Sequence, residues 1–277
     1  MHFHFPPDML EWYMVNTDRV VEEMIMKKKV SILLVITVVL GMLAACGTKE
    51  NTEDKKEDNV LIMGTNAEFP PYEFWQDGEI VGIDAEFAAA IAEKLGMEFK
   101  IEDMDFNAII PAVQSGKITF GAAGMTITED RQKQVDFTDT YYTGTQVIIV
   151  REDNTEITGP DDLAEKKIGV QQGTTGDIYA SDDYGDEYIE RFNKGMEAVQ
   201  SLSQGKIDAV IIDDQPAKAF VEQNEGLKIL DAEYIVEDYA MCFKKGNDEL
   251  LEKVNAAIRE LKEDGTLDKI VSKYISE

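Results

Sequence analysis

The stretch QSGKITFGAA, residues 114–123, recurs in altered form as SQGKIDAVII, residues 203–212. Both copies finish a helix-like segment, turn through Gly-Lys-Ile and continue as an apolar strand. A second pair, LIMGTN (61–66) and KIGVQQGTT (167–175), repeats the passage from an apolar strand into polar turn residues. The repetition predicts two similar α/β lobes, although a chance likeness between two strand-turn units would give the same pattern.

Helices and strands alternate around the first copy of this motif. Upstream of it, Asp84 can cap a helix over residues 85–96, which Gly96 would end. A second helix over 108–116 leads into an apolar strand over 118–124. This alternation is typical of a mixed, mostly parallel sheet that is flanked by helices on both faces.

Two strand-like segments are suited to cross between the lobes. They are GTQVIIVRED (144–153) and YAMCFKKGN (239–247), and the second half of the repeat lies between them. We therefore expect lobe 1 to comprise residues 60–148 plus 240–277, with residues 149–239 inserted into it as lobe 2.

The N-terminal region has the pattern of a secretory signal peptide. MKKKVSILLVITVVLGMLAAC (26–46) has three lysines followed by an uncharged run over 30–45. That run of 16 residues is shorter than the about 20 needed to span a bilayer, but it suits a signal peptide. Leu43-Ala44-Ala45-Cys46 resembles the lipobox of bacterial lipoproteins, in which the cysteine carries lipid such as palmitate. A buried apolar helix with an incidental cysteine is the alternative.

The segments on either side of Cys46 do not look like parts of a folded core. Residues 1–45 are expected to be an upstream extension plus the signal peptide, with Met24 or Met26 as alternatives to Met1 for the true start. The segment 46–59 begins with the lipidated cysteine and is rich in charges, so it reads as a flexible tether.

Composition excludes several classes of function. The formal charge of −28 argues against nucleic-acid binding, which needs basic patches. The only histidines, His2 and His4, lie in the segment expected to be removed, so no imidazole base, typical zinc site or other metal centre is expected. Cys242 lies in an apolar stretch and is expected to be a buried thiol. We expect no cofactor.

Four loops are expected to meet at the carboxyl ends of the strands, where ligands bind in α/β sheets. Arg131 supplies a planar fork that suits a carboxylate, and Asp213 can pair with an ammonium group. Arg131 would lie in the first turn of a helix capped by Thr128, where a cation is disfavoured unless a ligand carboxylate compensates it. Other donors are Thr126, Gly124 and Thr175, and the aromatic walls are Phe69, Tyr72 and Phe106. The set suits a zwitterion.

From about Val60 to Tyr274 the chain resembles the solute-binding protein family 3 of ABC transporters, the polar amino-acid receptors of bacteria. The order and spacing of several motifs over the whole domain make the resemblance specific. These motifs are GTNAEFPPYEF (64–74), GEIVGIDAEFAAAIAEKLG (78–96), MDFNAIIPAVQSGK (104–117), GMTITEDRQKQVDFT (124–138), IGVQQGTT (168–175), GKIDAVIIDD (205–214) and EDGTLDKIVSKY (263–274).

The resemblance implies a type II periplasmic-binding-protein fold with the ligand in the cleft between lobes. Arg131 matches the arginine that binds the ligand α-carboxylate, helped by Thr126 and Thr175. Asp213 matches the aspartate that binds the α-ammonium, together with a backbone oxygen near Gly124. Asp214 is the alternative to Asp213, and Arg131 could instead bridge surface acids such as Asp136. Phe69 and Phe106 match the aromatic pair around the ligand side chain.

The side-chain preference stays open at this point. Asn66 stands where several relatives have an acid, and Gln171 is a further neutral polar candidate. Glu68 would select a cationic ligand if it pointed inward and would leave a polar neutral site if it pointed outward. Amides or cystine-like compounds and basic amino acids are therefore both expected, with acidic ones least favoured by the negative protein.

The resemblance also implies how the protein works. It would close its lobes around an extracellular amino acid and deliver it to an ABC transporter permease, as a monomer anchored by Cys46 at the cell surface or in the periplasm. It would not be an enzyme. The alternatives are a cleft enzyme of the same fold, similar to cyclohexadienyl dehydratase, and a ligand sensor.

Overall fold

The computed structural model describes residues 59–275 of the 277-residue chain. The predicted signal peptide, the lipidation site Cys46 and the tether up to residue 58 lie outside the described residues, so these expectations stay predictions. Within 59–275 no helix is long and apolar enough to cross a membrane.

The first lobe is built on a sheet with the strand order β5-β1-β6-β13-β7. Strand β1 pairs in parallel with β5 and β6, whereas β13 pairs antiparallel with β6 and β7. The strands are β1 (Val60–Thr65), β5 (Glu98–Asp103), β6 (Phe120–Gly121), β7 (Val135–Phe137) and β13 (Cys242–Lys244). As expected, the thiol of Cys242 is buried.

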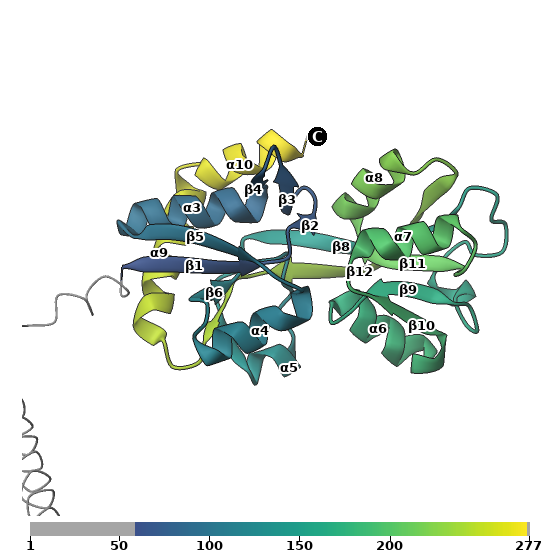
Figure 1. Cartoon of the computed structure of the whole chain (residues 1–277), viewed down its shortest axis with the longest axis horizontal. Helices are drawn as coiled ribbons and strands as arrows, with labels where there is room; N and C mark the ends of the chain where they lie inside the picture. The colour runs from purple at the N-terminus through teal and green to yellow at the C-terminus, as the bar shows by residue number, and fades with distance from the viewer. Residues whose placement is uncertain (1–58, 276–277) are drawn as a thin grey trace, which may run out of the picture. The chain divides into compact units, whose positions relative to one another are not determined.

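Helices cover this sheet, and a small sheet lies beside it with the order β2-β3-β4. The helices are α3 (Ile83–Leu95), α4 (Phe106–Ser115), α5 (Glu129–Gln132), α9 (Asp248–Glu263) and α10 (Thr266–Tyr274). The small sheet comprises β2 (Glu68–Phe69), β3 (Glu73–Gln76) and β4 (Glu79–Val81). Figure 1 shows α10 at the C-terminal end of the described chain, close to α3.

Helix α3 ends as the sequence predicts but begins differently. Gly96 takes a left-handed conformation directly after the helix, with φ at 66°. The N-cap is Gly82, so the prediction that Asp84 caps the helix is wrong. The buried Asp84 carboxylate instead accepts hydrogen bonds from the backbone N–H of Gly124 at 2.8 Å and the hydroxyl of Tyr141 at 2.6 Å.

The second lobe is built on a sheet with the order β10-β9-β11-β8-β12. Here β9 pairs in parallel with β10 and β11, whereas β8 pairs antiparallel with β11 and β12. The strands are β8 (Tyr142–Arg151), β9 (Ile168–Gln171), β10 (Ile189–Phe192), β11 (Ala209–Asp213) and β12 (Leu227–Tyr239). The helices are α6 (Thr175–Tyr184), α7 (Gly195–Ser203), α8 (Asp214–Gln223), η1 (Pro160–Asp162) and η2 (Asp186–Tyr188).

Strands β8 and β12 join the lobes as a long antiparallel pair, which runs from Arg151↔Leu227 to Tyr142↔Tyr239. The first predicted crossing segment overlaps β8. The second crossing is made by the end of β12, because residues 242–244 form the separate strand β13 of the first sheet. The predicted boundary at 148/149 falls inside β8, and the division of the chain at this residue stays a prediction.

The repeated motif has the same structural role in both lobes. Its first copy leads from the end of α4 into β6, and its second copy leads from the end of α7 into β11. Both strands lie in the middle of their sheets. The predicted two-lobed α/β fold with mixed sheets is thereby confirmed. In each sheet parallel and antiparallel pairings occur side by side, because β13 in the first sheet and β8 in the second run antiparallel to both of their neighbours.

Candidate ligand-binding site

A pocket lies between the loops of the two lobes. All the predicted site residues line it except Thr126, Glu68 and Tyr72, and three lining residues were not predicted: Glu73, Ala123 and Thr174. The lining residues are Asn66, Phe69, Glu73, Phe106, Ala123, Gly124 and Arg131 from lobe 1, and Gln171, Thr174, Thr175 and Asp213 from lobe 2.

Arg131 lies in the short helix α5, where the hydroxyl of Thr128 caps its backbone N–H at 3.2 Å as predicted. Its buried guanidinium donates to the carbonyl of Thr126 at 2.7 Å and to the carbonyl of Gly173 at 3.0 Å. It also lies over the ring of Phe106, 5.3 Å from the centroid. Because Gly173 belongs to lobe 2, Arg131 joins the lobes across the pocket.

Asp213 ends β11 and is 5% exposed. Its carboxylate accepts hydrogen bonds from the amide of Gln146, at 2.8 Å, and from the hydroxyl of Tyr239. The alternative acid, Asp214, is turned toward the surface of α8, where it pairs with Lys218 at 2.7 Å. Asp213 is therefore the acid that this strand end presents to the pocket.

Burial raises the pKa of Asp213 well above its usual range, and the negative charge of Glu237 raises it further. Burial lowers the pKa of Arg131, and the same Glu237 is the main charge that opposes this effect. The two opposite charges of the site are thus both poorly solvated. Each would gain from a ligand group of the opposite charge.

Two further contacts cross the pocket mouth. The amide of Gln171 donates to the side-chain oxygen of Asn66 at 2.8 Å. Glu68 forms an ion pair with Lys194 of lobe 2, and both side chains are partly exposed. Of the two orientations considered for Glu68, the structure has the one outside the pocket lining.

The acid that does line the pocket is Glu73, on β3. It is 1% exposed, and its Oε2 atom has no hydrogen-bond partner among the described residues. Burial raises its pKa well above the usual range, and the neighbouring Asp84 adds to the rise. Burial also raises the pKa of Asp84 to about 6, against the hydrogen bonds that it accepts. Sequence reasoning missed Glu73 because glutamates are rarely fully buried.

The aromatic wall is formed by Phe69 and Phe106. Tyr72, the third predicted aromatic, lies behind Phe69, and the centroids of these two rings are 5.9 Å apart. The Tyr72 side chain is fully buried, and its hydroxyl has no hydrogen-bond partner in the described part of the chain. It supports the wall and does not itself line the pocket.

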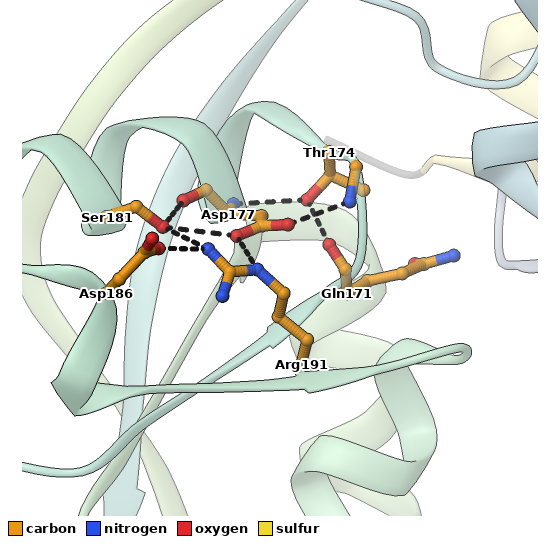
Figure 2. A network of polar contacts seen from close by, with 7 residues as sticks. Gln171, Thr174, Asp177, Ser181, Asp186 and Arg191 are labelled. Atoms are coloured by element: carbon orange, nitrogen blue, oxygen red, sulfur yellow. Dashed lines mark hydrogen bonds and ion pairs between the residues drawn. The ribbon is translucent and has the colours of Figure 1, made fainter.

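A polar network holds the loop before α6 in place (Figure 2). The hydroxyl of Thr174 caps the N–H of Asp177, and the Asp177 carboxylate accepts from the N–H of Gly173 at 2.9 Å. Arg191 donates to that carboxylate at 2.8 Å and also pairs with Asp186. The network fixes the N-terminus of α6, which begins at Thr175, near Arg131. A helix N-terminus favours anions.

The pocket can therefore receive a zwitterion with an additional positive charge. Among the described residues that line it, Arg131 is the only cation, whereas Glu73 and Asp213 are acids. Arg131 and the α6 N-terminus suit an anionic group, and Asp213 suits a cationic one. Glu73 has no counter-charge of its own in the lining.

Two lobes joined by paired strands, with a polar pocket between them, define a solute-binding protein. Residues 61–277 match the model of bacterial extracellular solute-binding proteins, family 3, and the chain belongs to this family. It is 36% identical to the arginine-binding extracellular protein ArtP of Bacillus subtilis (strain 168) over 255 residues, which cover 90% of this chain and 98% of ArtP.

Solved structures of amino-acid-binding proteins are also similar to this chain. An ancestral arginine-binding protein bound to arginine is 46% identical, with a TM-score of 0.74, and the match covers 79% of this chain and 99% of that one. The ancestral protein bound to glutamine is 45% identical, with a TM-score of 0.75 and the same coverage. These relatives are named as binding proteins for amino acids, which supports amino-acid binding by this chain and agrees with the expectation that it is a binding protein and not an enzyme.

Proposed function

We propose that this protein binds an amino acid with a cationic side chain, L-arginine or a close analogue, in the pocket between its lobes. The observation that carries the proposal is the charge of the lining, in which two buried acids face one buried arginine. A zwitterion satisfies one acid and the arginine. The second acid then selects a ligand with one more positive group.

Each ligand group has a partner of opposite character. The α-carboxylate would lie between the Arg131 guanidinium and the N-terminus of α6, and the α-ammonium would lie against Asp213. The side chain would extend between Phe69 and Phe106 toward Glu73, whose Oε2 atom lacks a partner in the described structure. A guanidinium donates to a carboxylate in a planar, two-pronged geometry, so it suits Glu73 well.

The named relatives support this ligand but leave a competitor. ArtP and the arginine-bound ancestral protein favour arginine, whereas the glutamine-bound ancestral structure shows that a site of this family can take a neutral amide. A thermal-shift screen of the purified protein against the common amino acids and ornithine separates these possibilities.

We expect L-arginine to raise the melting temperature most, followed by lysine and ornithine. A ligand at 100 times its Kd stabilises the folded state by about 2.7 kcal/mol, which is easily detected. If glutamine alone stabilised the protein, the preferred ligand would be a neutral amide and not a cationic amino acid. A response to aspartate or glutamate alone, or to sugars or peptides but no amino acid, would reject the proposal.

Delivery to a membrane permease is the second part of the proposed function. Contacts such as Arg131 to Gly173 and Gln171 to Asn66 join the lobes across the pocket. A ligand that touches both lobes would favour this closed arrangement over an open one. The closed form would present a single surface, made from both lobes, to the permease of an ABC transporter.

Anchoring through lipid on Cys46 is the third part. Cys46→Ser is expected to abolish incorporation of labelled palmitate and to move the protein from the membrane to the soluble fraction, or to leave an unprocessed precursor. Cys242→Ser is the matched control, because the Cys242 side chain is buried and unavailable for modification. Equal membrane association of both variants, with no label on either, would contradict lipid anchoring.

A further inference from the structure

Glu237 lies near the end of β12, where the chain crosses between the lobes, and is 4% exposed. A single oxygen, Oε2, accepts three hydrogen bonds from different parts of the molecule. The donors are the hydroxyl of Thr126 at 3.1 Å, the hydroxyl of Thr175 at 2.9 Å and the amide of Gln146 at 3.1 Å. The sequence did not mark Glu237 as a site residue.

The donors come from both lobes and from the strand between them. Thr126 belongs to lobe 1, just before α5, and Thr175 begins α6 in lobe 2. Gln146 lies on the crossing strand β8. If the lobes separate, Thr126 and Thr175 move apart, and one carboxylate oxygen no longer reaches both. The three-way contact therefore exists only when the lobes are together.

Glu237 lies one layer behind the pocket. It is not a lining residue, but Thr175 is, and the carbonyl of Thr126 holds the Arg131 guanidinium at 2.7 Å. A hydroxyl has a single proton to donate. In this structure both threonines donate that proton to Glu237.

This arrangement adds a contact between lobes to the role that the family resemblance implies for the two threonines. Glu237 also opposes the cost of burying Arg131, since it is the main charge that counteracts the burial-induced fall in the pKa of that arginine. One carboxylate thus supports both the closed arrangement and the anion-binding side of the pocket.

We infer that Glu237 is a positioning residue that ties the two lobes together behind the bound ligand and thereby slows ligand release. The inference rests on the proposed binding of a cationic amino acid. It assigns Glu237 no contact with that ligand. Its effect should therefore fall on the dissociation rate, since the tie forms after the lobes have come together.

The test is release of radiolabelled L-arginine from the full chain, chased with unlabelled arginine. Glu237→Ala should release arginine about 10- to 100-fold faster, as expected when hydrogen bonds to a charged group are lost, with little change in the association rate. Glu237→Gln should fall between this variant and wild type, because its amide oxygen still accepts a hydrogen bond. Asp238→Asn is the control, since Asp238 is exposed and its side chain accepts a hydrogen bond only from Thr143 among the described residues.

Hydrogen–deuterium exchange of the ligand-free chain gives a readout that does not require arginine. Amides of residues 124–128 and 172–176 should exchange faster in Glu237→Ala and should be unchanged in Asp238→Asn. If the wild-type protein bound no arginine, the proposed ligand would be wrong. The exchange rates would then still test whether Glu237 joins the lobes. Wild-type exchange in both loops, or a wild-type release rate in Glu237→Ala, would overturn the inference.

A double-mutant cycle separates the tie from a general loss of structure. Thr175→Val should speed arginine release in the wild-type background and should add little in the Glu237→Ala background, because the hydroxyl then has lost its acceptor. Equal effects of Thr175→Val in both backgrounds would show that the hydroxyl serves the ligand directly, which contradicts the inference. If Glu237→Ala does not fold, the same cycle with Glu237→Gln decides.

Discussion

Arg131→Ala is expected to weaken L-arginine binding by about 30-fold to several thousand-fold, which corresponds to roughly 2 to 5 kcal/mol. The guanidinium is buried, and it would be the only cation facing the ligand carboxylate among the described lining residues. Its removal would leave that carboxylate desolvated and unpaired. Asp213→Asn is expected to weaken binding on the same scale, because it removes the partner of the α-ammonium.

Calorimetry with purified variants measures these losses, and thermal unfolding shows whether each variant is folded. Lys133→Ala is the control for Arg131, because Lys133 is an exposed cation at the end of the same helix and pairs with Asp130. Asp214→Asn is the control for Asp213. An affinity within about threefold of wild type, below 1 kcal/mol, would show that the substituted residue has only a structural role.

Glu73→Gln is expected to change which amino acid the protein prefers. Loss of a hydrogen-bonded charge opposite the guanidinium should weaken arginine binding by roughly 10- to 150-fold, or about 1.5 to 3 kcal/mol. Glutamine, which brings no positive side chain, should bind at least as well as it binds wild type. The ratio of the two dissociation constants, measured by calorimetry, is the quantity that decides.

Glu68→Gln is the matched control, since it makes the same chemical change on the neighbouring strand β2 at the partly exposed pair with Lys194. It should leave the preference between arginine and glutamine unchanged. If Glu68→Gln abolished the preference for arginine and Glu73→Gln did not, the acid that selects the ligand would be misassigned.

The pH dependence of binding offers a further check on Glu73. Burial and Asp84 hold its pKa well above the usual range, so the free protein keeps a proton on Glu73 at pH values where an ordinary glutamate is ionised. A bound guanidinium favours the ionised form, and binding therefore releases a proton. Arginine affinity should rise with pH up to the pKa of Glu73 in the free protein and should then level off. Glu73→Gln should remove this part of the rise in affinity.

The pocket residues at strand ends could be predicted from the sequence, because each follows an apolar run whose last residue can be recognised. Asp213 follows the run that forms β11, and Arg131 follows a capping threonine in a recognisable motif. The structure brings both to one pocket. Their binding roles stay predictions until the variants are measured.

The acids that act from within strands were not predictable in the same way. Glu73 lies on a strand between Tyr72 and Phe74, and Glu237 lies on a strand between Val236 and Asp238. Glutamates are rarely fully buried, so neither position is marked as a site by its residue type. Burial of each depends on packing between segments far apart in the chain. The prediction that Asp84 caps α3 was wrong for a related reason. Its position before the helix suits a cap, but its carboxylate accepts a hydrogen bond from Tyr141, which lies far away in the sequence.

The interleaving of the lobes dictates the order in which their sheets can be completed. Strand β13 lies between β6 and β7, so the first sheet lacks an interior strand until residue 244 has been synthesised. Every strand of the second sheet lies within residues 142–239. A chain that emerges N-terminus first therefore has all the strands of its inserted lobe before the enclosing lobe can close its sheet. During that interval the edges of β6 and β7 are open to wrong pairing.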